Sequence, residues 1–540
     1  MRWRGMLDAL VVALSVALIA RLIVVFALRL PYQYDLEWME GGMLVHAWRV
    51  QQGLPLYPPP SPDWVPYVYP PGYAVLVAAL GKVFGLAPML GRAVSLVGTV
   101  LAAVAAAGVV RQERGSWPLA VGTAAAFAGT YEASGAFYDL VRPDGLFMGL
   151  LALSIWLAAT PSRAAAAGFA LAGAFALKHN AAFFGPVMLA AIVLRDGWRK
   201  GAVFSLASAG TSLCWLVPLQ VTSGGLFLQY LVTVPASHPV DGPRILPGTP
   251  AELAAALPFA LMLVSAALLR RQQLSVAALS IVAGAGAVAA SWTLVDAETF
   301  RWAAILGTSA LVAVGVSVAT ATTSATRADL AWRPTLWIGL GATSVVVAAW
   351  MRGHHGGFLN VLVPMFWMVT VGAGLVAARL PAGWRWVGSM VFVAQLGLQH
   401  GRAAYDRLVP TEADEAAGRR IVNRLRGCPG PVWSPYASWL PVLADKRPGP
   451  HLIAVWDIAH KEGPFFEAMG QFKEAALSHR WACVLDGGVK GVGYGVNEAY
   501  TQEHLDTAPG AMAPKTGWRI QAKSIWVPKD RTANPVKRAP

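Results

Sequence analysis

The chain has 540 residues, of which 56% are hydrophobic and only 13% are charged. Soluble proteins carry about 25% charged residues, so the composition excludes an ordinary soluble protein and predicts a polytopic membrane protein. Basic loops on one side of a membrane explain the net charge of +14, and no basic run with interleaved aromatic residues indicates nucleic-acid binding. Three cysteines exclude a disulfide-rich scaffold and lack metal-ligand spacing, although a single Cys428–Cys483 bridge stays open if the C-terminal part is periplasmic.

Apolar runs that reach or approach the length of a bilayer span recur from the N-terminus to about residue 400. The first run has no small-residue cleavage site before the acidic residues that follow it, so it is predicted to be a span and not a cleaved signal peptide. The predicted spans, about 13 in number, cover residues 7–30, 89–110, 118–137, 145–160, 165–181, 182–195, 202–222, 251–269, 274–295, 302–320, 335–350, 358–378 and 386–400.

The apolar run 72–86 decides the orientation, because counting it as a span would reverse every later loop. It is only about 15 residues long and contains Lys82, so we place it at the interface. About 14 basic residues then fall in the loops on one side, and most acidic loop residues fall on the other. The positive-inside rule therefore predicts a multi-pass protein of a bacterial inner membrane, with a cytoplasmic N-terminus and a periplasmic C-terminal domain.

The loop after the first span, residues 31–71, begins with "YQYDLEWMEGG", which brings Asp35, Glu37 and Glu40 close together in sequence. Residues 38–52 predict a helix that lies in the interface plane, with apolar side chains lending it a membrane-facing surface. The next stretch, "GLPLYPPPSPDWVPYVYPPGY", is rich in proline, which excludes a regular helix, and in aromatic residues, which favour the headgroup region. The loop is therefore predicted to form a lid-like structure on the outer surface.

Residues 401–527 are predicted to form a separate α/β domain, because the charge density rises and the apolar runs shorten. "EADEAAGRRIVNRLRG" predicts a helix that stops at its glycine. "PVWSP", "HLIAVWD" and "WACVLDGG" predict short strands, with helical segments near residues 436–443 and 464–479. The glycines of "LDGGVKGVGYG" do not match the dinucleotide-binding fingerprint, and residues 528–540 are predicted to be a disordered tail.

A second acidic group stands in "YDLVRPDG" at residues 138–145, between the third and fourth spans. Asp139 and Asp144 lie on the same predicted outer face as the first loop, where they can converge with Asp35 or Glu40. Carboxylates at a membrane surface can act as general bases or can hold a divalent cation that shields a phosphate. They can equally be solvated surface residues, and the residues alone leave both interpretations open.

Several stretches follow the first span in a characteristic order. They are "YDLEWMEGG", "WRVQQGLPLY", "YPPGYAVLVAALGKVFG", "GRAVSLVG", "RPDGLFMGLLAL", "ALKHNAAFFGP" and the late "HHGGFLNVLVP". In this order, over roughly residues 1–400, the chain resembles the GT-C superfamily of polytopic glycosyltransferases, and in particular bacterial members related to protein O-mannosyltransferases and lipid A aminoarabinose transferases.

The resemblance implies an enzyme that transfers a sugar from a polyprenyl-phosphate carrier to a lipid, glycan or protein acceptor outside the cytoplasmic membrane. It also implies that an acidic residue of the first loop is the catalytic base. Relatives often have adjacent Asp and Glu residues, whereas this chain has Asp-Leu-Glu followed by Met-Glu-Gly. Asp35 is the favoured base and Glu37 and Glu40 are the alternatives, one of which can be an acid that only favours a helix N-terminus.

A donor phosphate requires cations on the same side of the membrane, and several stand near outer span ends. The candidates are Arg142, Lys178, His179, Arg352 and His354, with Arg301 and His355 in similar positions. Lys178 and Arg352 can instead extend to the interface, and Arg142 can pair with Asp139 or Asp144. Adjacent histidines in an extended loop point in opposite directions, which disfavours zinc. A divalent cation such as Mg²⁺ or Mn²⁺ is a further option, with Asp139 and Asp144 as its site. Whether the reaction needs a metal stays open, because a monophosphate leaving group carries less charge than a pyrophosphate.

Two other classes of function remain as alternatives. A lipid or sugar transporter or flippase would place polar groups at the membrane midplane, often within internal repeats, and no clear repeat is present. A non-catalytic envelope assembly protein would use the C-terminal domain to bind a partner enzyme. The first alternative would move labelled lipid without forming a product, and the second would tolerate substitution of the outer-loop acids.

Overall fold

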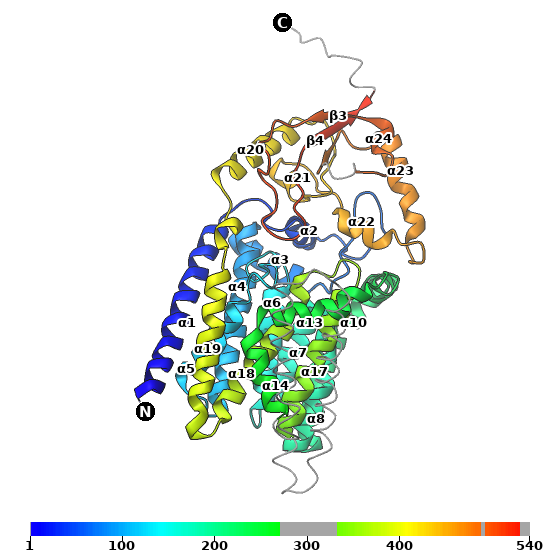
Figure 1. The fold of residues 1–540 in the computed structure, drawn as a ribbon. Coiled ribbons are helices and arrows are strands. Elements are labelled where there is room, and N and C mark those ends of the chain that lie inside the picture. Colours follow the sequence, from blue (N-terminus) through cyan, green and yellow to red (C-terminus); the bar gives the residue numbers. More distant parts are fainter. Residues whose placement is uncertain (1, 270–331, 488–491, 530–540) are drawn as a thin grey trace.

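The computed structural model describes residues 2–269, 332–487 and 492–529. A bundle of helices forms the N-terminal part, and the C-terminal domain covers one end of the bundle (Figure 1). The bundle helices are α1 (Arg2–Arg29), α4 (Pro88–Gln112), α5 (Trp117–Ala128), α6 (Asp144–Ala159), α7 (Ala164–Leu177), α8 (Gly185–Asp196), α9 (Trp198–Ser205), α10 (Thr211–Thr222), α11 (Leu226–Leu228), α12 (Val234–Ala236), α13 (Thr249–Ala256), α14 (Pro258–Leu269), α17 (Trp332–Gly353), α18 (Val363–Arg379) and α19 (Arg385–Arg402).

Every predicted span outside residues 270–331 overlaps a helix of the bundle, whereas 274–295 and 302–320 lie outside the described residues. Five described helices are long and apolar enough to cross a membrane, and a sixth span is formed if a bent pair counts as one. The long helices are Trp3–Arg29, Pro88–Gln112, Trp198–Thr222, Trp332–Gly353 and Leu359–Arg379. Other apolar helices are shorter than a full span, so length and composition alone support fewer spans than the sequence predicts.

Two predicted spans differ from continuous helices for local reasons. The span 118–137 ends as α5 at Ala128, and the chain then turns through Gly135 and Ala136, whose φ angles are +74° and +59°. The span 251–269 is broken into α13 and α14, which form part of a pair bent by 105°. Pro258 follows the break, and a proline disfavours helical backbone in the residue before it.

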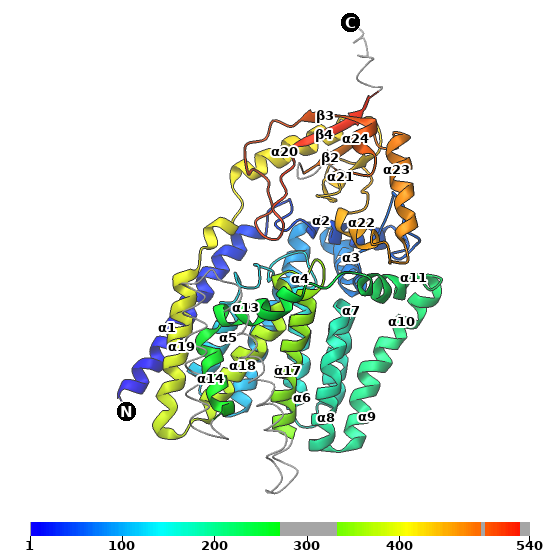
Figure 2. The same ribbon diagram turned by 45° about the vertical axis from the view of Figure 1, so that its right-hand side comes forward.

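Helix α2 (Glu40–Gln51) is the predicted helix of the first loop, and it lies between the bundle and the C-terminal domain (Figures 1 and 2). The next helix, α3 (Gly72–Phe84), packs against α2. The glycines of "MEGG" also let other segments approach α2 closely. A Cβ atom on Gly41 would lie 2.9 Å from the backbone nitrogen of Trp439, and one on Gly42 would lie 1.8 Å from the Tyr67 hydroxyl. The helix is therefore covered on both sides and does not lie open at an interface.

The C-terminal domain contains a four-stranded sheet in the order β1-β2-β4-β3. Strands β1 and β2 are parallel, and β4 is antiparallel to both β2 and β3. The strands are β1 (Val432–Trp433), β2 (Cys483–Asp486), β3 (Tyr500–His504) and β4 (Ser524–Pro528). The helices are α20 (Glu412–Arg426), α21 (Leu440–Leu443), α22 (Leu452–Ile458), α23 (Met469–Leu477) and α24 (Val496–Ala499).

The sequence predicted α20 and the first two strands, but its prediction of a strand at "HLIAVWD" is wrong. This stretch is α22, whose first turn is capped by the His451 ring accepting the N–H of Ile453. A short apolar run does not distinguish a strand from a buried helix by periodicity, and the cap decides here. Strands β3 and β4 were not predicted. Strand β3 exposes most of its polar side chains and lacks an apolar run.

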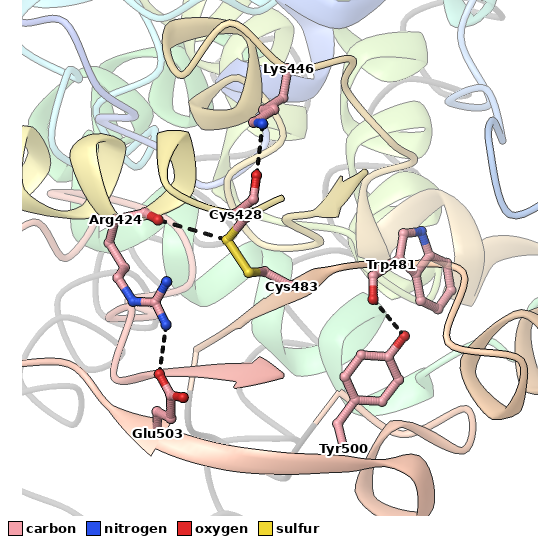
Figure 3. Close-up of a disulfide and its surroundings, with 7 residues drawn as sticks. All are labelled: Arg424, Cys428, Lys446, Trp481, Cys483, Tyr500 and Glu503. Atoms are coloured by element: carbon pink, nitrogen blue, oxygen red, sulfur yellow. Dashed lines mark hydrogen bonds and ion pairs between the residues drawn. A yellow bond between two sulfur atoms is a disulfide. The ribbon is translucent and has the colours of Figure 1, made fainter. Parts of the chain in front are cut away.

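The Cys428–Cys483 bridge that the sequence left open is formed (Figure 3). It joins the second residue after α20 to the first residue of β2 and closes a separation of 55 residues. On one side of it, the Arg424 guanidinium donates to Glu503 at 2.6 Å, which ties α20 to β3. The disulfide and this ion pair together hold the helix against the sheet.

Candidate active site

The first loop and the second acidic loop are held together by a buried ion pair between Glu40 and Arg92. Arg92 Nε donates to Oε1 at 3.0 Å and Nη2 donates to Oε2 at 2.7 Å. The same carboxylate accepts the N–H of Leu36 and the N–H of Val141, both at 2.6 Å. Both side chains are fully buried, and every oxygen of Glu40 is engaged. Glu40 is thus a structural anchor that joins the two loops to α4.

A second buried pair joins α1 to the loop before α6. Arg29 donates to Asp139 at 2.6 and 3.2 Å, and the Tyr131 hydroxyl donates to the same carboxylate at 2.9 Å. Arg29 also donates to the carbonyl oxygen of Leu408, at the entry to the C-terminal domain. Asp139 is therefore neutralised by a cation and does not face Asp144 as part of an acidic pair.

The predicted residues that do meet form a continuous series of side chains with alternating charge. Arg142 Nη1 lies 3.3 Å from Glu37 Oε2, and Arg142 Nε lies 3.8 Å from Asp144 Oδ2. The Lys178 ammonium then donates to Asp144 Oδ1 at 2.6 Å, and the Asn360 amide donates to the same oxygen at 2.7 Å. Residues from four separate segments, far apart in sequence, therefore converge at the end of the bundle under the C-terminal domain.

Some side-chain atoms in and beside this series of charged residues have no hydrogen-bond partner. Arg142 Nε and Asp144 Oδ2 are buried and lack a hydrogen-bond partner among the described residues, as do His179 Nδ1 and Asn180 Oδ1. A buried polar atom without a partner costs free energy unless a ligand or water satisfies it. Arg142 also receives support from the Tyr69 hydroxyl, to which its Nη2 donates at 3.0 Å. This arrangement suits a site that receives a polar ligand.

Asp35 differs from the other acids of the first loop because no cation pairs with it among the described residues. Its Oδ2 is buried and has no hydrogen-bond partner there. The side chain lines a cavity of about 20 Å³, enough for a single water, together with Tyr436 and Asp486 of the C-terminal domain. Burial and the neighbouring Glu40 carboxylate raise the pKa of Asp35 well above its usual value. A carboxylate of this kind is a stronger proton acceptor than a solvated one when ionised.

Glu37, two residues after Asp35, is the acid of the first loop that contacts Arg142. It accepts the N–H of Met39 at 3.3 Å as well as contacting Arg142. Burial raises the pKa of Glu37 to about 7, and the Arg142 guanidinium opposes that rise. Gly517, at φ +70°, brings a loop of the C-terminal domain directly onto this side chain.

The C-terminal domain covers the first-loop acids through backbone and aromatic contacts. The N–H groups of Lys515 and Thr516 both donate to the carbonyl oxygen of Leu36, at 2.7 and 3.1 Å. The Trp38 ring lies 4.9 Å from the His451 ring and 5.1 Å from the Trp518 ring, centroid to centroid. The first-loop acids therefore lie between the bundle and the C-terminal domain, which covers them.

The remaining predicted cations lie elsewhere. Arg352 makes a bidentate ion pair with Glu252, with contacts of 2.7 to 3.1 Å. No described contact joins Arg352 to Arg142 or to its charged partners. The His354 ring lies against the His238 ring at a tilt of 40°, with centroids 4.9 Å apart, and its Nε2 contacts the carbonyl oxygen of Pro235. His179 follows Lys178 directly and is half-buried. Arg301 lies outside the described residues.

The donor set does not fit a divalent cation at Asp139 and Asp144. Each carboxylate already has a cationic partner, Arg29 for Asp139 and Lys178 for Asp144. Among the residues that the structure describes, no group of three or more His, Cys, Asp or Glu side chains is arranged to hold a metal ion. We therefore route no chemical step through a metal.

Sequence reasoning missed Arg29, Arg92 and Asn360. Arg92 stands near the start of a long apolar helix and is fully buried, which is the usual mark of an intramembrane charge with a partner. That signal was present in "GRAVSLVG", but the partner, Glu40, could not be chosen from three nearby acids by sequence alone. Asn360 lies within "HHGGFLNVLVP", but nothing in that stretch marks it as a partner of Asp144.

Comparisons with known proteins give structural matches only. No protein-family model and no curated protein sequence matches the chain. A crystal structure of ArnT from Cupriavidus metallidurans bound to undecaprenyl phosphate is similar, with 14% identity over 96% of this chain and 99% of that chain and a TM-score of 0.47. The apo structure of the same protein is similar at 13% identity, over 96% and 98% of the chains, with a TM-score of 0.46. ArnT is a lipid A aminoarabinose transferase, one of the proteins that the order of motifs in the sequence resembles.

Proposed function

We propose that the chain is a membrane glycosyltransferase that transfers a sugar from a polyprenyl-phosphate donor to an acceptor at the outer face of the membrane. The observation that carries this proposal is that an acid without a cationic partner and two cations lie at the same end of the bundle, under the C-terminal domain. Asp35 offers a carboxylate without a cationic partner among the described residues, and Arg142, which shares Asp144 with Lys178, keeps a buried Nε that has no hydrogen-bond partner there. A base beside a phosphate-binding cation pair is what this transfer requires.

In the proposed reaction, Asp35 accepts the proton of the acceptor's nucleophile while that nucleophile attacks the anomeric carbon of the donor sugar. The bond between the anomeric carbon and the phosphate oxygen breaks, and both bonding electrons leave with the polyprenyl phosphate. Arg142 and Lys178 stabilise the negative charge that develops on the leaving phosphate. Glu37 orients Arg142, with which it is in contact.

We infer that this pocket faces the periplasm of a bacterium. The division of charge among the loops supports this placement, as does the Cys428–Cys483 disulfide, because disulfides persist in oxidising compartments outside the cytoplasm. The acceptor is a lipid, a glycan or a protein of the cell envelope.

The test uses the full-length chain in liposomes with a radiolabelled polyprenyl-phosphate sugar and a membrane extract as the source of acceptor. We expect Asp35→Asn to keep its folded yield but lose about 10²–10⁴-fold of the transfer rate. Asp445→Asn, at an exposed carboxylate of the C-terminal domain, is the matched control and keeps the wild-type rate. Full transfer by Asp35→Asn would refute the assignment of the base, and movement of labelled lipid across the bilayer without product would favour a flippase.

A further inference from the structure

A second and larger cavity, of about 330 Å³, adjoins the small cavity at Asp35. Gly487 and Pro514 line both, so the two spaces meet across these residues. Within the part of the chain that the structure describes, no carboxylate lines the larger cavity, whereas four cationic side chains do. These are Arg407, Lys515, Arg519 and Lys523.

Two of the four cations already have carboxylate partners. Lys515 Nζ donates to Asp414 Oδ2 at 2.7 Å, in a largely buried pair. Arg407 Nη2 donates to Glu132 Oε1 at 3.0 Å, which links the entry of the C-terminal domain to the region after α5. These pairs fix the cavity wall and leave little of their charge for a ligand.

Arg519 and Lys523 are the two cations that remain available. Both side chains are exposed, and neither forms an ion pair with a carboxylate of the described residues. An arginine beside a lysine suits a phosphate, because the guanidinium contacts two oxygens in its plane while the ammonium acts as a point charge. The cavity therefore has a net positive charge that its own wall does not balance.

The wall that carries these cations is held in place from both sides. The segment before Arg519 is bound to the first loop by the N–H groups of Lys515 and Thr516. Gln521 closes the opposite turn, since its amide oxygen accepts the N–H of Gly510 at 3.0 Å and its amide nitrogen donates to Ala508 at 2.6 Å. A cavity built on such contacts is formed before a ligand arrives.

We propose that this cavity binds a phosphate group of the acceptor through Arg519 and Lys523. The proposal rests on the proposed function, because the acceptor is the molecule whose nucleophile must reach Asp35. The cavity at Asp35 holds only about one water, so the body of an acceptor lies in the adjoining larger space. An acceptor anchored by its phosphate at Arg519 and Lys523 extends past Gly487 and Pro514 and presents its nucleophile to Asp35.

The test measures binding of a phosphate probe by the full-length chain in detergent. The probes are dioctanoyl phosphatidic acid, its phosphate-free control dioctanoylglycerol, and inorganic phosphate. We expect Arg519→Gln/Lys523→Gln to weaken binding of the phosphatidic acid about tenfold or more, since it removes two charge-assisted contacts. The matched control Arg420→Gln/Lys461→Gln removes the same charge from exposed positions that do not line the cavity and leaves the affinity unchanged.

Equal weakening by both double variants, or no weakening by the cavity variant, would overturn the site. Inorganic phosphate that binds as tightly as the lipid probe would overturn the assignment to an acceptor headgroup and indicate a free-phosphate site. The Asp35→Asn variant separates a failure of this phosphate site from a failure of the proposed transfer reaction. If Asp35→Asn transfers sugar normally while the cavity variant still loses the probe, the base assignment fails and the phosphate site stands.

Discussion

Glu40 and Arg92 form a bidentate ion pair in which neither side chain reaches solvent, with contacts of 3.0 and 2.7 Å. Removing one member would leave the other as an uncompensated buried charge. We expect Arg92→Gln to lower the free energy of unfolding by about 3–5 kcal/mol, measured as thermal unfolding of the purified protein in detergent. Glu40→Gln is expected to destabilise in the same way, because Glu40 also holds the N–H groups of Leu36 and Val141.

The double variant Glu40→Gln/Arg92→Gln completes a thermodynamic cycle and should lose less than the sum of the single variants. A Glu40→Gln protein that melts like the wild type but transfers no sugar would show that Glu40 acts in the reaction. In that case the structural assignment of the pair would be wrong.

The pH dependence of transfer should report the two acids of the pocket that have raised pKa values. Burial raises the pKa of Glu37 to about 7, and the Glu37 carboxylate itself raises the pKa of Asp35. Asp35 must be ionised to accept the proton, so the rate should fall as the pH drops, and the loss of the Glu37 charge near pH 7 should lower it further by releasing Arg142. In Glu37→Gln the pKa of Asp35 should fall, because one negative neighbour is lost, and the acidic limb should move to lower pH.

The measurement is a pH–rate profile for the wild type and for Glu37→Gln. Glu467→Gln, at an exposed position of the C-terminal domain, serves as the control and keeps the wild-type profile. An acidic limb that stays in place in Glu37→Gln would mean that the two acids are not electrostatically coupled in the reacting enzyme.

The disulfide should contribute strongly to the stability of the C-terminal domain. It closes a separation of 55 residues. For a loop of this length, the chain-entropy relation gives a loss of about 4 kcal/mol when Cys428→Ala/Cys483→Ala removes the bridge. Limited proteolysis and thermal unfolding of the purified protein would measure the loss, with Cys214→Ala, at an exposed free thiol, as the control. Equal stability of the bridged and unbridged proteins would contradict the prediction.

A cluster of histidines joins the bundle to the C-terminal domain and should make their contact sensitive to acid. The His238 ring lies 4.5 Å from the His460 ring and 4.9 Å from the His354 ring, between centroids, and His355 lies near both segments. The carboxyl of Asp457 is 4.0 Å from His238 Nε2. Burial lowers the pKa of His238 to about 4 and raises that of Asp457 to about 8, so neither group carries a full charge at neutral pH.

The unfolded chain protonates His238 near its ordinary pKa of about 6.5, whereas the folded chain does so near 4. The unfolded state therefore binds more protons between these values, and the contribution of His238 to stability falls as the pH falls through this range. Asp457 has the opposite dependence, so the effect of His238 is isolated by comparison with His238→Asn. The wild-type melting temperature should fall more steeply than that of His238→Asn between pH 6.5 and 4, and parallel curves would contradict this.

Local patterns in the sequence determined most of the helical segments of the bundle. Apolar runs of span length predict the bundle, and the positions of Asp35, Asp139 and Asp144 between spans place them at one end, where they lie. The capping residue Thr411 and the glycine at 427 similarly delimit α20. These features depend on residues near one another in the chain, so composition and periodicity are enough to find them.

Only the tertiary structure decided which of the acids pair with a cation. Glu40 is paired by Arg92, 52 residues away, and Asp139 by Arg29, 110 residues away, which leaves Asp35 without a cationic partner in the described structure. The C-terminal domain that covers Asp35 comes from the other end of the chain. Charge pairing and burial depend on contacts between distant segments, and no local pattern contains that information.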